Sequence, residues 1–432
     1  MTPTVERLRA TRRSRNAGRT ALAIQSGLDP QGRRALKVID LFCGAGGLTA
    51  GFEAAGLNVA VASDFWRPAA ATHIANFPKT PFIEADIREV TAESLSAFCG
   101  GAVDVVVGGP PCQGFSSAGA RAEGDVRNSL VGRYARLAVE LEPRAIVFEN
   151  VEGFLTAGGG AFVVDLLDPL IEAGYTVHLE KLNVANFGVP QLRKRVICIA
   201  TKRRAPKPLE PTHSASGAPG VWRQGLGLPY TRTVDDALQS NSASMSDPLA
   251  EVRTPSPTDL RRIAALSQGQ TMRDLKGDLQ HPSYARRANR RVADGTPTEH
   301  RGGAPAGLRR LVSSEPSKAI TSAAVREFIH PHENRMLTLR EAATLQTFPP
   351  DFRFLGNRSE IATLIGNAIP PRFAQALGAA VMASLQQPEV DDEGYIHHFV
   401  VTHAEALSPA LARTVALVEN RYRHASEAPA LF

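Results

Sequence analysis

The feature that most constrains the fold is an alternation that begins at Lys37. Short apolar runs, typical of buried strands, occupy residues 38–42, 59–62, 103–107, 145–148 and 196–200. Stretches compatible with helices lie between them and include residues 48–55, 68–76, 133–141 and 162–173. Apolar strands that alternate with helices predict an α/β fold with a mainly parallel sheet covered on both faces. Such sheets bind cofactors at the carboxyl ends of their strands.

The alternation stops near residue 202. Residues 203–330 are rich in Pro, Gly, Ser and Arg and predict a second, smaller and irregular domain. Helices are expected again at 339–346, 372–385 and 409–422. The predicted organisation is a basic N-terminal extension (1–36), the first part of the sheet domain (37–202), the irregular domain (203–330), a return to the sheet domain (331–386) and a C-terminal extension (387–432).

The formal net charge of +6 is unevenly spread. Residues 1–36 carry a net +6, residues 201–330 carry +8, and the rest carries −8. A basic central segment beside an acidic body indicates a polyanion-binding face, although a solvated loop region has the same charge. In the N-terminal extension, Arg12, Arg13 and Arg15 could contact phosphates or belong to a flexible tail.

The cysteines limit the chemistry further. Cys43, Cys99, Cys112 and Cys198 are widely spaced and form no CxxC pair, so neither zinc nor another metal site is expected. No apolar run reaches the roughly 18 residues that span a membrane, and the N-terminus lacks the apolar stretch of a secretory signal. We therefore expect a cytoplasmic protein with reduced thiols, one of which could be a nucleophile.

Two segments place glycines after a predicted strand. In VIDLFCGAGGLTAGF (38–52), a strand runs into Gly44, Gly46 and Gly47, and a helix follows. Glycines there let the backbone approach a ligand, and the helix N-terminus favours anionic groups, although such a turn can be purely structural. In VVVGGPPCQGFSSAG (105–119), two glycines and two prolines precede Cys112 and would hold its thiol at the strand's carboxyl end. A lone Cys is otherwise usually a small buried residue.

A carboxylate follows a third strand. In IVFENVEGF (146–154), Glu149 and Asn150 end an apolar run. A carboxylate there could bind a base edge or move protons, although strand-terminal Glu is often only a turn or cap residue.

Together these segments resemble the C5-cytosine DNA methyltransferase family, and more specifically its bacterial-type modification methylases. The ENV of the third segment (149–151) and three further motifs occur in the family's order: QLRKR (191–195), RMLTLREAATLQTFP (335–349) and GNAIPPRFA (366–374). The resemblance covers about 37–200 and 331–386, and the stretch between is the family's target-recognition domain. It implies a Rossmann-like methyltransferase sheet that uses S-adenosylmethionine as methyl donor and double-stranded DNA as substrate.

The resemblance also implies catalytic roles. Cytosine C5 is a poor nucleophile, and a thiolate added at C6 activates it. Cys112 is then this nucleophile, and Glu149 hydrogen bonds N3 and the exocyclic amine. Arg193 and Arg195 lie near O2 and the flanking phosphate, where positive charge stabilises the adduct and the thiolate.

For the cofactor, the resemblance implies three groups of contacts. Phe42, Gly44, Gly46, Gly47 and Asn367 line the methionine part. Asp64 accepts the ribose hydroxyls, although the family usually has Glu there. Phe65 stacks on adenine, with Trp66 as the competing candidate, and Asp86 reads the adenine amino group.

For DNA, the target base must leave the stack, and residues 113–128 resemble the loop that closes over it. The expected DNA contacts are Gln113, Ser116, Arg127, Gln191, Arg286, Arg287, Arg290, Arg291, Arg309 and Arg310. Arginines bind phosphates as well as guanine, so most of the last six are expected to be phosphate contacts or solvated, and one or two to read bases.

Three rival functions fit the sequence less well. A related tRNA methyltransferase would have a shorter recognition region, a catalytically dead regulator would have lost Cys112 or Glu149, and a dehydrogenase fits neither PPCQ nor the insert. By analogy with the family, the protein acts as a monomer and protects DNA against a cognate restriction endonuclease.

Overall fold

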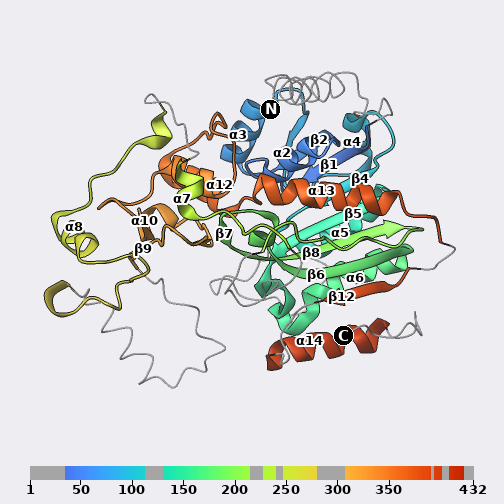
Figure 1. Ribbon diagram of the computed structural model, residues 1–432. Coiled ribbons are helices and arrows are strands. Elements are labelled where there is room, and N and C mark those ends of the chain that lie inside the picture. Colours follow the sequence, from blue (N-terminus) through green and yellow to red (C-terminus); the bar gives the residue numbers. More distant parts are fainter. Residues whose placement is uncertain are drawn as a thin grey trace, which may run out of the picture. The chain divides into compact units, whose positions relative to one another are not determined.

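The computed structural model describes residues 35–111, 130–214, 227–239, 247–279, 307–390, 394–400 and 408–422 (Figure 1). The chain forms two compact units. Unit 1 comprises Met1–Asn183, Lys194–Pro211 and Ile369–Phe432, and unit 2 comprises Val184–Arg193 and Thr212–Ala368. Within the described residues, no helix is long and apolar enough to cross a membrane.

Unit 1 is built on an eight-stranded sheet with the order β12-β6-β8-β5-β4-β1-β2-β3. Its strands are β1 (Lys37–Leu41), β2 (Asn58–Asp64), β3 (Phe82–Glu84), β4 (Val105–Gly108), β5 (Ala145–Val151), β6 (Tyr175–Asn183), β8 (Lys194–Lys202) and β12 (Ile396–Val400). Only β8 runs antiparallel to its neighbours, and the other neighbouring pairs are parallel. The predicted mainly parallel sheet is confirmed.

The reversal of β8 follows from a short connection. Only residues 184–193 join β6 to β8, and they contain the 3-10 turn η4 (Val184–Phe187) and β7 (Gln191–Leu192). A parallel crossover needs a dozen or more residues, usually with a helix. The chain therefore returns antiparallel, a direction that the apolar run at 196–200 did not reveal.

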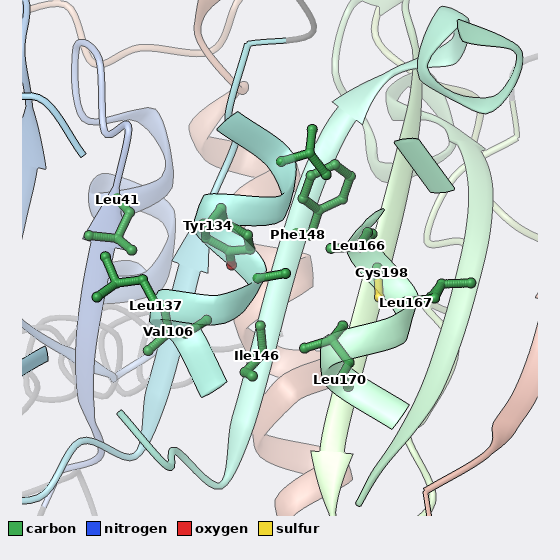
Figure 2. Packing of buried hydrophobic residues seen from close by; sticks show 14 of the residues in the cluster. Leu41, Val106, Tyr134, Leu137, Ile146, Phe148, Leu166, Leu167, Leu170 and Cys198 are labelled. Atoms are coloured by element: carbon green, nitrogen blue, oxygen red, sulfur yellow. The ribbon is translucent and has the colours of Figure 1, made fainter. Parts of the chain in front are cut away.

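Both faces of the sheet are covered. On one face, α4 (Ala92–Cys99), α5 (Leu130–Glu140) and α6 (Ala161–Glu172) pack on a core that includes Leu41, Val106, Tyr134, Phe148 and Cys198 (Figure 2). On the opposite face, α2 (Gly47–Ala54) lies against β1, and α13 (Pro371–Leu385) packs on α2. Burial on both sides explains why the strands are continuous apolar runs rather than alternating ones.

The strand order reverses between β1 and β4. After β1 the chain moves outward to β2 and β3, whereas after β4 it moves the other way to β5. Doubly wound sheets bind ligands at the carboxyl ends of the strands at such a switch point. In this chain, β1 ends there in the glycine-rich turn, and β4 runs into Gly109, Pro110 and Pro111.

The C-terminal extension belongs to unit 1. Strand β12 pairs parallel with β6 at the edge of the sheet. The helix expected at 409–422 is confirmed as α14 (Pro409–Tyr422). Arg421 holds both carboxylate oxygens of Asp168 on α6, at 2.7 and 2.6 Å, and Tyr422 donates a hydroxyl hydrogen bond to the same carboxylate.

Unit 2 has little regular structure. Its helices are α7 (Val234–Gln239), α8 (Pro257–Ala264), α10 (Ala324–Glu327), α11 (Leu339–Leu345) and α12 (Arg358–Asn367), and its strands β7, β9 (Arg309–Arg310), β10 (Ser317–Lys318) and β11 (Phe328–Ile329) have two residues each. The unit boundaries differ from the predicted domains, because 331–368 lies in unit 2 and 203–211 in unit 1. The roles predicted for these domains stay predictions.

Candidate active site

The glycine-rich turn joins β1 to α2 at the switch point. Gly44 and Gly46 have φ of 55° and 91°, a region that favours glycine. A Cβ on Gly46 would lie 2.5 Å from the Phe77 ring, and one on Gly47 would lie 2.1 Å from the carbonyl oxygen of Ile369. A Cβ on Gly44 would meet nothing within 4 Å. Gly46 and Gly47 therefore serve close packing, while Gly44 borders open space that a ligand can enter.

Two carboxylates bracket this turn. Asp64, at the end of β2, accepts hydrogen bonds from the backbone N–H of Gly44 at 3.0 Å and of Trp66 at 2.9 Å. Burial raises the pKa of Asp64, although these backbone bonds oppose the rise. Asp40, on β1, accepts a hydrogen bond of 2.7 Å from the hydroxyl of Thr49. Two hydrogen-bond acceptors therefore lie beside the glycine-rich turn.

Two aromatic residues predicted for the cofactor lie nearby. Phe65 directly follows β2, and its side chain is 64% exposed, whereas the competing Trp66 is only partly exposed. Phe42 has a positive φ of 57° and packs half-buried against the core. Phe65 is thus the aromatic with a free face at this end of the sheet, as stacking on a planar ring requires.

Asp86 follows β3 in a tight turn. Its carboxylate accepts hydrogen bonds from the backbone N–H of Arg88 and from both arms of the Arg88 guanidinium, at 2.9 and 2.5 Å. These hydrogen bonds, chiefly those from the Arg88 side chain, lower the pKa of Asp86 to about 2. The carboxylate is therefore ionised, partly exposed and already paired before any ligand binds.

Glu149 lies near the end of β5, beside the path of the chain toward Cys112. Its carboxylate is buried and pairs with the Arg195 guanidinium at 2.7 Å. A Cβ on Gly109 would lie 2.8 Å from a carboxylate oxygen of Glu149. The Asn150 amide donates a hydrogen bond of 2.9 Å to the carbonyl of Pro110. The ENV segment thus fixes the residues that directly precede Cys112.

Gln191 and Arg193 are buried inside unit 2. The Gln191 side chain bonds the side chain of Gln346 at 2.6 Å and the backbone N–H of Ile320 at 3.0 Å. Arg193 donates to the carbonyls of Ile320 and Gly366 at 2.5 and 2.8 Å. The motifs QLRKR, RMLTLREAATLQTFP and GNAIPPRFA are thereby tied together. Arg195, rather than Arg193, reaches Glu149.

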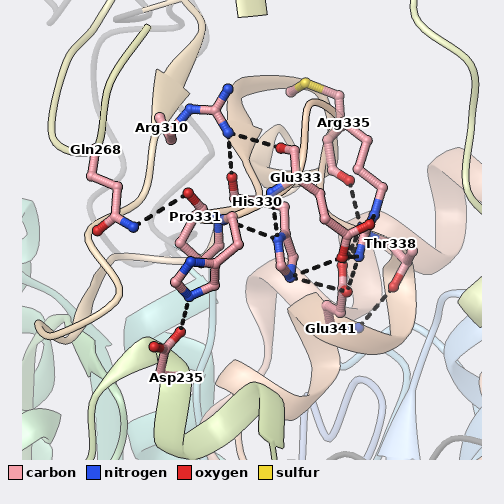
Figure 3. Close-up of polar contacts among 11 residues, drawn as sticks. Asp235, Gln268, Arg310, His330, Pro331, Glu333, Arg335, Thr338 and Glu341 are labelled. Atoms are coloured by element: carbon pink, nitrogen blue, oxygen red, sulfur yellow. Dashed lines mark hydrogen bonds and ion pairs between the residues drawn. The ribbon is translucent and has the colours of Figure 1, made fainter. Parts of the chain in front are cut away.

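Arg310 is also engaged internally, as Figure 3 shows for part of its network. The side chain is only 6% exposed. It donates to the carbonyls of Ile263, Leu266, His330 and Glu333 and to the Asn334 side chain, at 2.6–2.9 Å. These bonds occupy all five donors of a guanidinium. A DNA contact through this side chain would require breaking them, whereas Arg309 is only half-buried.

The remaining predicted residues divide into two groups. Asn367 is exposed at the end of α12 in unit 2. Cys112, Gln113, Ser116, Arg127, Arg286, Arg287, Arg290 and Arg291 lie outside the described residues.

Sequence reasoning missed three residues near the turn. Asp40, Thr49 and His73 are fully buried polar residues linked by hydrogen bonds. Asp40 lies inside the predicted strand 38–42. An acidic residue within an apolar run could have identified it as a candidate functional residue.

Comparisons with known proteins agree with this geometry. A family model described as C-5 cytosine-specific DNA methylase matches residues 36–383. The Type II methyltransferase M.XorII of Xanthomonas oryzae pv. oryzae is 32% identical over 390 residues, covering 82% of this chain and 87% of that protein. M.AgeI of Thalassovita gelatinovora, also a Type II methyltransferase, is 30% identical over 428 residues, covering 81% of this chain and 100% of that protein.

A solved structure resembles the chain as well. It is that of a candidate DNA modification methyltransferase encoded within an E. coli prophage, with a TM-score of 0.58 and 26% identity. The match covers 82% of this chain and 100% of that chain.

Proposed function

The chain belongs to the family of C-5 cytosine-specific DNA methylases and is a DNA (cytosine-5)-methyltransferase, and from this premise we propose how it works. It transfers the methyl group of S-adenosylmethionine to C5 of a cytosine turned out of duplex DNA. The observation that carries this proposal is the position of Glu149. Arg195 holds it against Gly109, three residues before Cys112, at the switch point of the sheet.

The residues around the glycine-rich turn fit S-adenosylmethionine, which supplies an electrophilic methyl group on a sulfonium. Gly44 borders open space, and Gly46 and Gly47 form the start of α2, two and three residues further along the chain. Phe42, Gly44, Gly46, Gly47 and Asn367 would line the methionine part, Asp64 would accept the ribose hydroxyls, Phe65 would stack on adenine and Asp86 would bind its amino group. Because Arg88 already uses both oxygens of Asp86, the adenine amino group must share this carboxylate.

The proposed chemistry begins with Cys112. Its thiolate forms a bond to C6, and the electron pair of the C5–C6 double bond moves onto C5. C5 then takes the methyl group from the sulfonium, whose carbon–sulfur bond breaks to leave S-adenosylhomocysteine. Loss of the C5 proton and departure of the Cys112 thiolate restore the aromatic ring. Glu149, paired with a guanidinium, is an acceptor for the exocyclic amine, and it must first take up a proton before it can donate one to N3.

The two arginines of QLRKR divide the predicted roles. We assign the contact with O2 of the base to Arg195, because its guanidinium forms an ion pair with Glu149. Arg193 donates hydrogen bonds to the carbonyls of Ile320 and Gly366, so we assign it the role of stabilising unit 2. A positive group beside the base stabilises charge that develops after thiolate attack.

A covalent trap tests the mechanism. DNA with 5-fluorocytosine at the target has no C5 proton to lose, so the wild-type enzyme should remain bonded to it. Cys112→Ala should abolish both trapping and methyl transfer and still bind target DNA. Equal turnover by Cys112→Ala and wild type would overturn the assignment. Methylation of tRNA instead of DNA would favour the rival substrate.

We further propose that residues 203–330 read the target sequence as the target-recognition domain. The basic residues of this segment include Arg286, Arg287, Arg290, Arg291, Arg309 and Arg310. Loss of a base-reading Arg should cost about 1–3 kcal/mol and relax one position, whereas loss of a phosphate contact should weaken all sequences alike. Exchanging the whole segment for that of a relative should change the methylated sequence, and an unchanged sequence would contradict the assignment.

The biological role proposed here is modification within a restriction-modification system. Support comes from M.XorII and M.AgeI, which are both named Type II methyltransferases. The enzyme would act in the cytoplasm as a monomer and protect the DNA that a cognate endonuclease cuts. Bisulfite sequencing of DNA from a host that expresses only this protein would identify the modified sequence, and resistance of that DNA to the cognate endonuclease would test protection.

A further inference from the structure

Three buried side chains form a hydrogen-bonded chain beside the glycine-rich turn. Asp40 comes from β1, Thr49 from the first turn of α2, and His73 from α3 (Arg67–Asn76). The Thr49 hydroxyl oxygen lies 2.7 Å from Asp40 Oδ2 and 3.0 Å from His73 Nε2. All three residues have no solvent exposure. The mechanism above gives none of them a role.

The direction of these hydrogen bonds follows from proton counting. A hydroxyl has one proton, so when Thr49 donates to Asp40 it must accept from His73. His73 is then neutral with its proton on Nε2, consistent with burial that lowers its pKa to about 4. Two buried atoms remain without a hydrogen-bond partner among the described residues, His73 Nδ1 and Asp40 Oδ1.

Asp40 also contacts the start of α2. The N-cap residue of this helix is Gly46, which has no side chain to bind the first N–H groups. The Asp40 carboxylate instead accepts a hydrogen bond from the hydroxyl of Thr49 in the first turn of the helix. A carboxylate from β1 is therefore tied to the N-terminal turn of α2, where the helix dipole favours negative charge.

The carboxylate is poorly compensated. Burial, with a smaller contribution from the charge of Asp64, raises the pKa of Asp40 to about 7, and only interactions with Thr49 oppose the rise. Of the other titratable groups that face it, His73 is neutral, and Asp40 itself helps to raise the pKa of Cys43 and of Tyr134. No cation is among the groups that shift Asp40 within the described residues. Its negative charge therefore lacks a counter-charge.

We propose that Asp40 is a positioning residue whose missing counter-charge is the sulfonium-bearing methyl donor, and that Thr49 and His73 hold the carboxylate ready for it. This inference rests on the proposed use of S-adenosylmethionine. That ligand carries a carboxylate, an ammonium and a sulfonium, a net charge of about +1 at pH 7. The demethylated product has lost the sulfonium. Asp40 thus favours donor over product by charge, and donor binding drives Asp40 into its ionised form.

The test is proton release on binding, measured with the full chain by calorimetry in buffers of different ionisation heat at pH 6.5. Binding of S-adenosylmethionine should release more protons than binding of S-adenosylhomocysteine. From pH 6 to pH 8, the Kd for the donor should fall by up to about tenfold and the Kd for the product by less than about twofold. Equal proton release by both ligands would overturn the inference.

Variants separate the charge effect from a structural one. Asp40→Asn should abolish the difference between the ligands while leaving any titration of the ligands themselves. Thr49→Val removes the bond that lowers the pKa of Asp40, so the rise in donor affinity should move to higher pH, and Thr49→Ser should restore it. Thr414→Val is the matched control, because Thr414 is equally buried and donates only to backbone carbonyls.

These outcomes separate the role of the Asp40–Thr49–His73 chain from the use of S-adenosylmethionine. A Thr49→Val profile that matches that of Thr414→Val would reject the role of the chain, even if Asp40→Asn fails to fold. Failure of the wild type to bind S-adenosylmethionine at all would reject the proposed cofactor instead.

Discussion

The glycine-rich turn of unit 1 and the Arg310 cluster of unit 2 bury charge in opposite ways. At the turn, Asp40 keeps one oxygen without a partner, and burial raises its pKa to about 7. In the cluster, Arg310 has an acceptor for each of its five donors. Arg310 is therefore fixed by bonds within the fold, whereas Asp40 keeps one acceptor available.

The physical reason lies in the local backbone. Burying a polar group is costly unless it is hydrogen bonded, so irregular segments must find donors for their carbonyls. Unit 2 has strands of only two residues, and side chains such as Arg193 and Arg310 supply those donors. In unit 1 the strands satisfy their carbonyls in the ladders of the eight-stranded sheet, and Asp40 bonds the side chain of Thr49 instead.

The Glu149–Arg195 pair is the sharpest test of this contrast, because it is buried and paired yet assigned to catalysis. Glu149→Gln should abolish most methyl transfer and also destabilise the fold by about 3–5 kcal/mol, since Arg195 loses its partner. Adding Arg195→Met should restore much of the thermal stability but no activity. Methyl transfer by the double variant at the wild-type rate would show that the pair is scaffold.

Arg310→Ala should act on stability alone. It removes one donor from each of four carbonyls, of which that of Ile263 keeps the backbone N–H of Leu266, and we expect the free energy of unfolding to fall by about 2–4 kcal/mol in chemical denaturation. The neighbouring Arg309→Ala is the control and should cost less than about 1 kcal/mol, because Arg309 is only half-buried. If Arg310→Ala has the free energy of unfolding of wild type but a weaker affinity for DNA, Arg310 is a DNA contact.

Asp86→Ala should weaken S-adenosylmethionine binding by about tenfold, because a charged hydrogen bond contributes about 1.5–3 kcal/mol. The Kd for DNA should not change. Arg88→Ala removes only an exposed ion pair and should alter cofactor affinity by less than about threefold. Calorimetry of both variants measures this directly, and unchanged affinity in Asp86→Ala would remove Asp86 from the site.

The smallest expected effect concerns Asp40 and pH. Its pKa is raised from 3.8 to about 7 on folding, so the folded state loses stability as pH rises from about 4 to about 7. Asp40→Asn removes this loss. The Tm of Asp40→Asn minus the Tm of wild type should therefore be about 2–4 °C larger at pH 8 than at pH 5. A pH-independent difference would show that folding does not raise the pKa of Asp40 and that its carboxyl is already ionised at pH 5.

Much of unit 1 was predictable because its signals are local. Apolar runs marked five strands of the sheet, and the turns after two of them marked Gly44 and Cys112. Strand β12 and helix α4 of this unit were missed, and so were strands β3 and β6. β3 has three residues, and β6 mixes charged with apolar residues, so neither forms a clear apolar run.

The sequence by itself determined the α/β alternation, the order of the motifs and the residue types at the strand ends, because each depends on neighbouring residues and on strand or helix periodicity. Only the tertiary structure decided how these residues are used. It reversed β8, set Arg195 rather than Arg193 on Glu149, and enclosed Arg310 in carbonyls. It also joined Asp40 to Thr49 and His73. Whether an arginine binds backbone or ligand depends on which carbonyls lack donors after folding, and those carbonyls come from segments far apart in the chain.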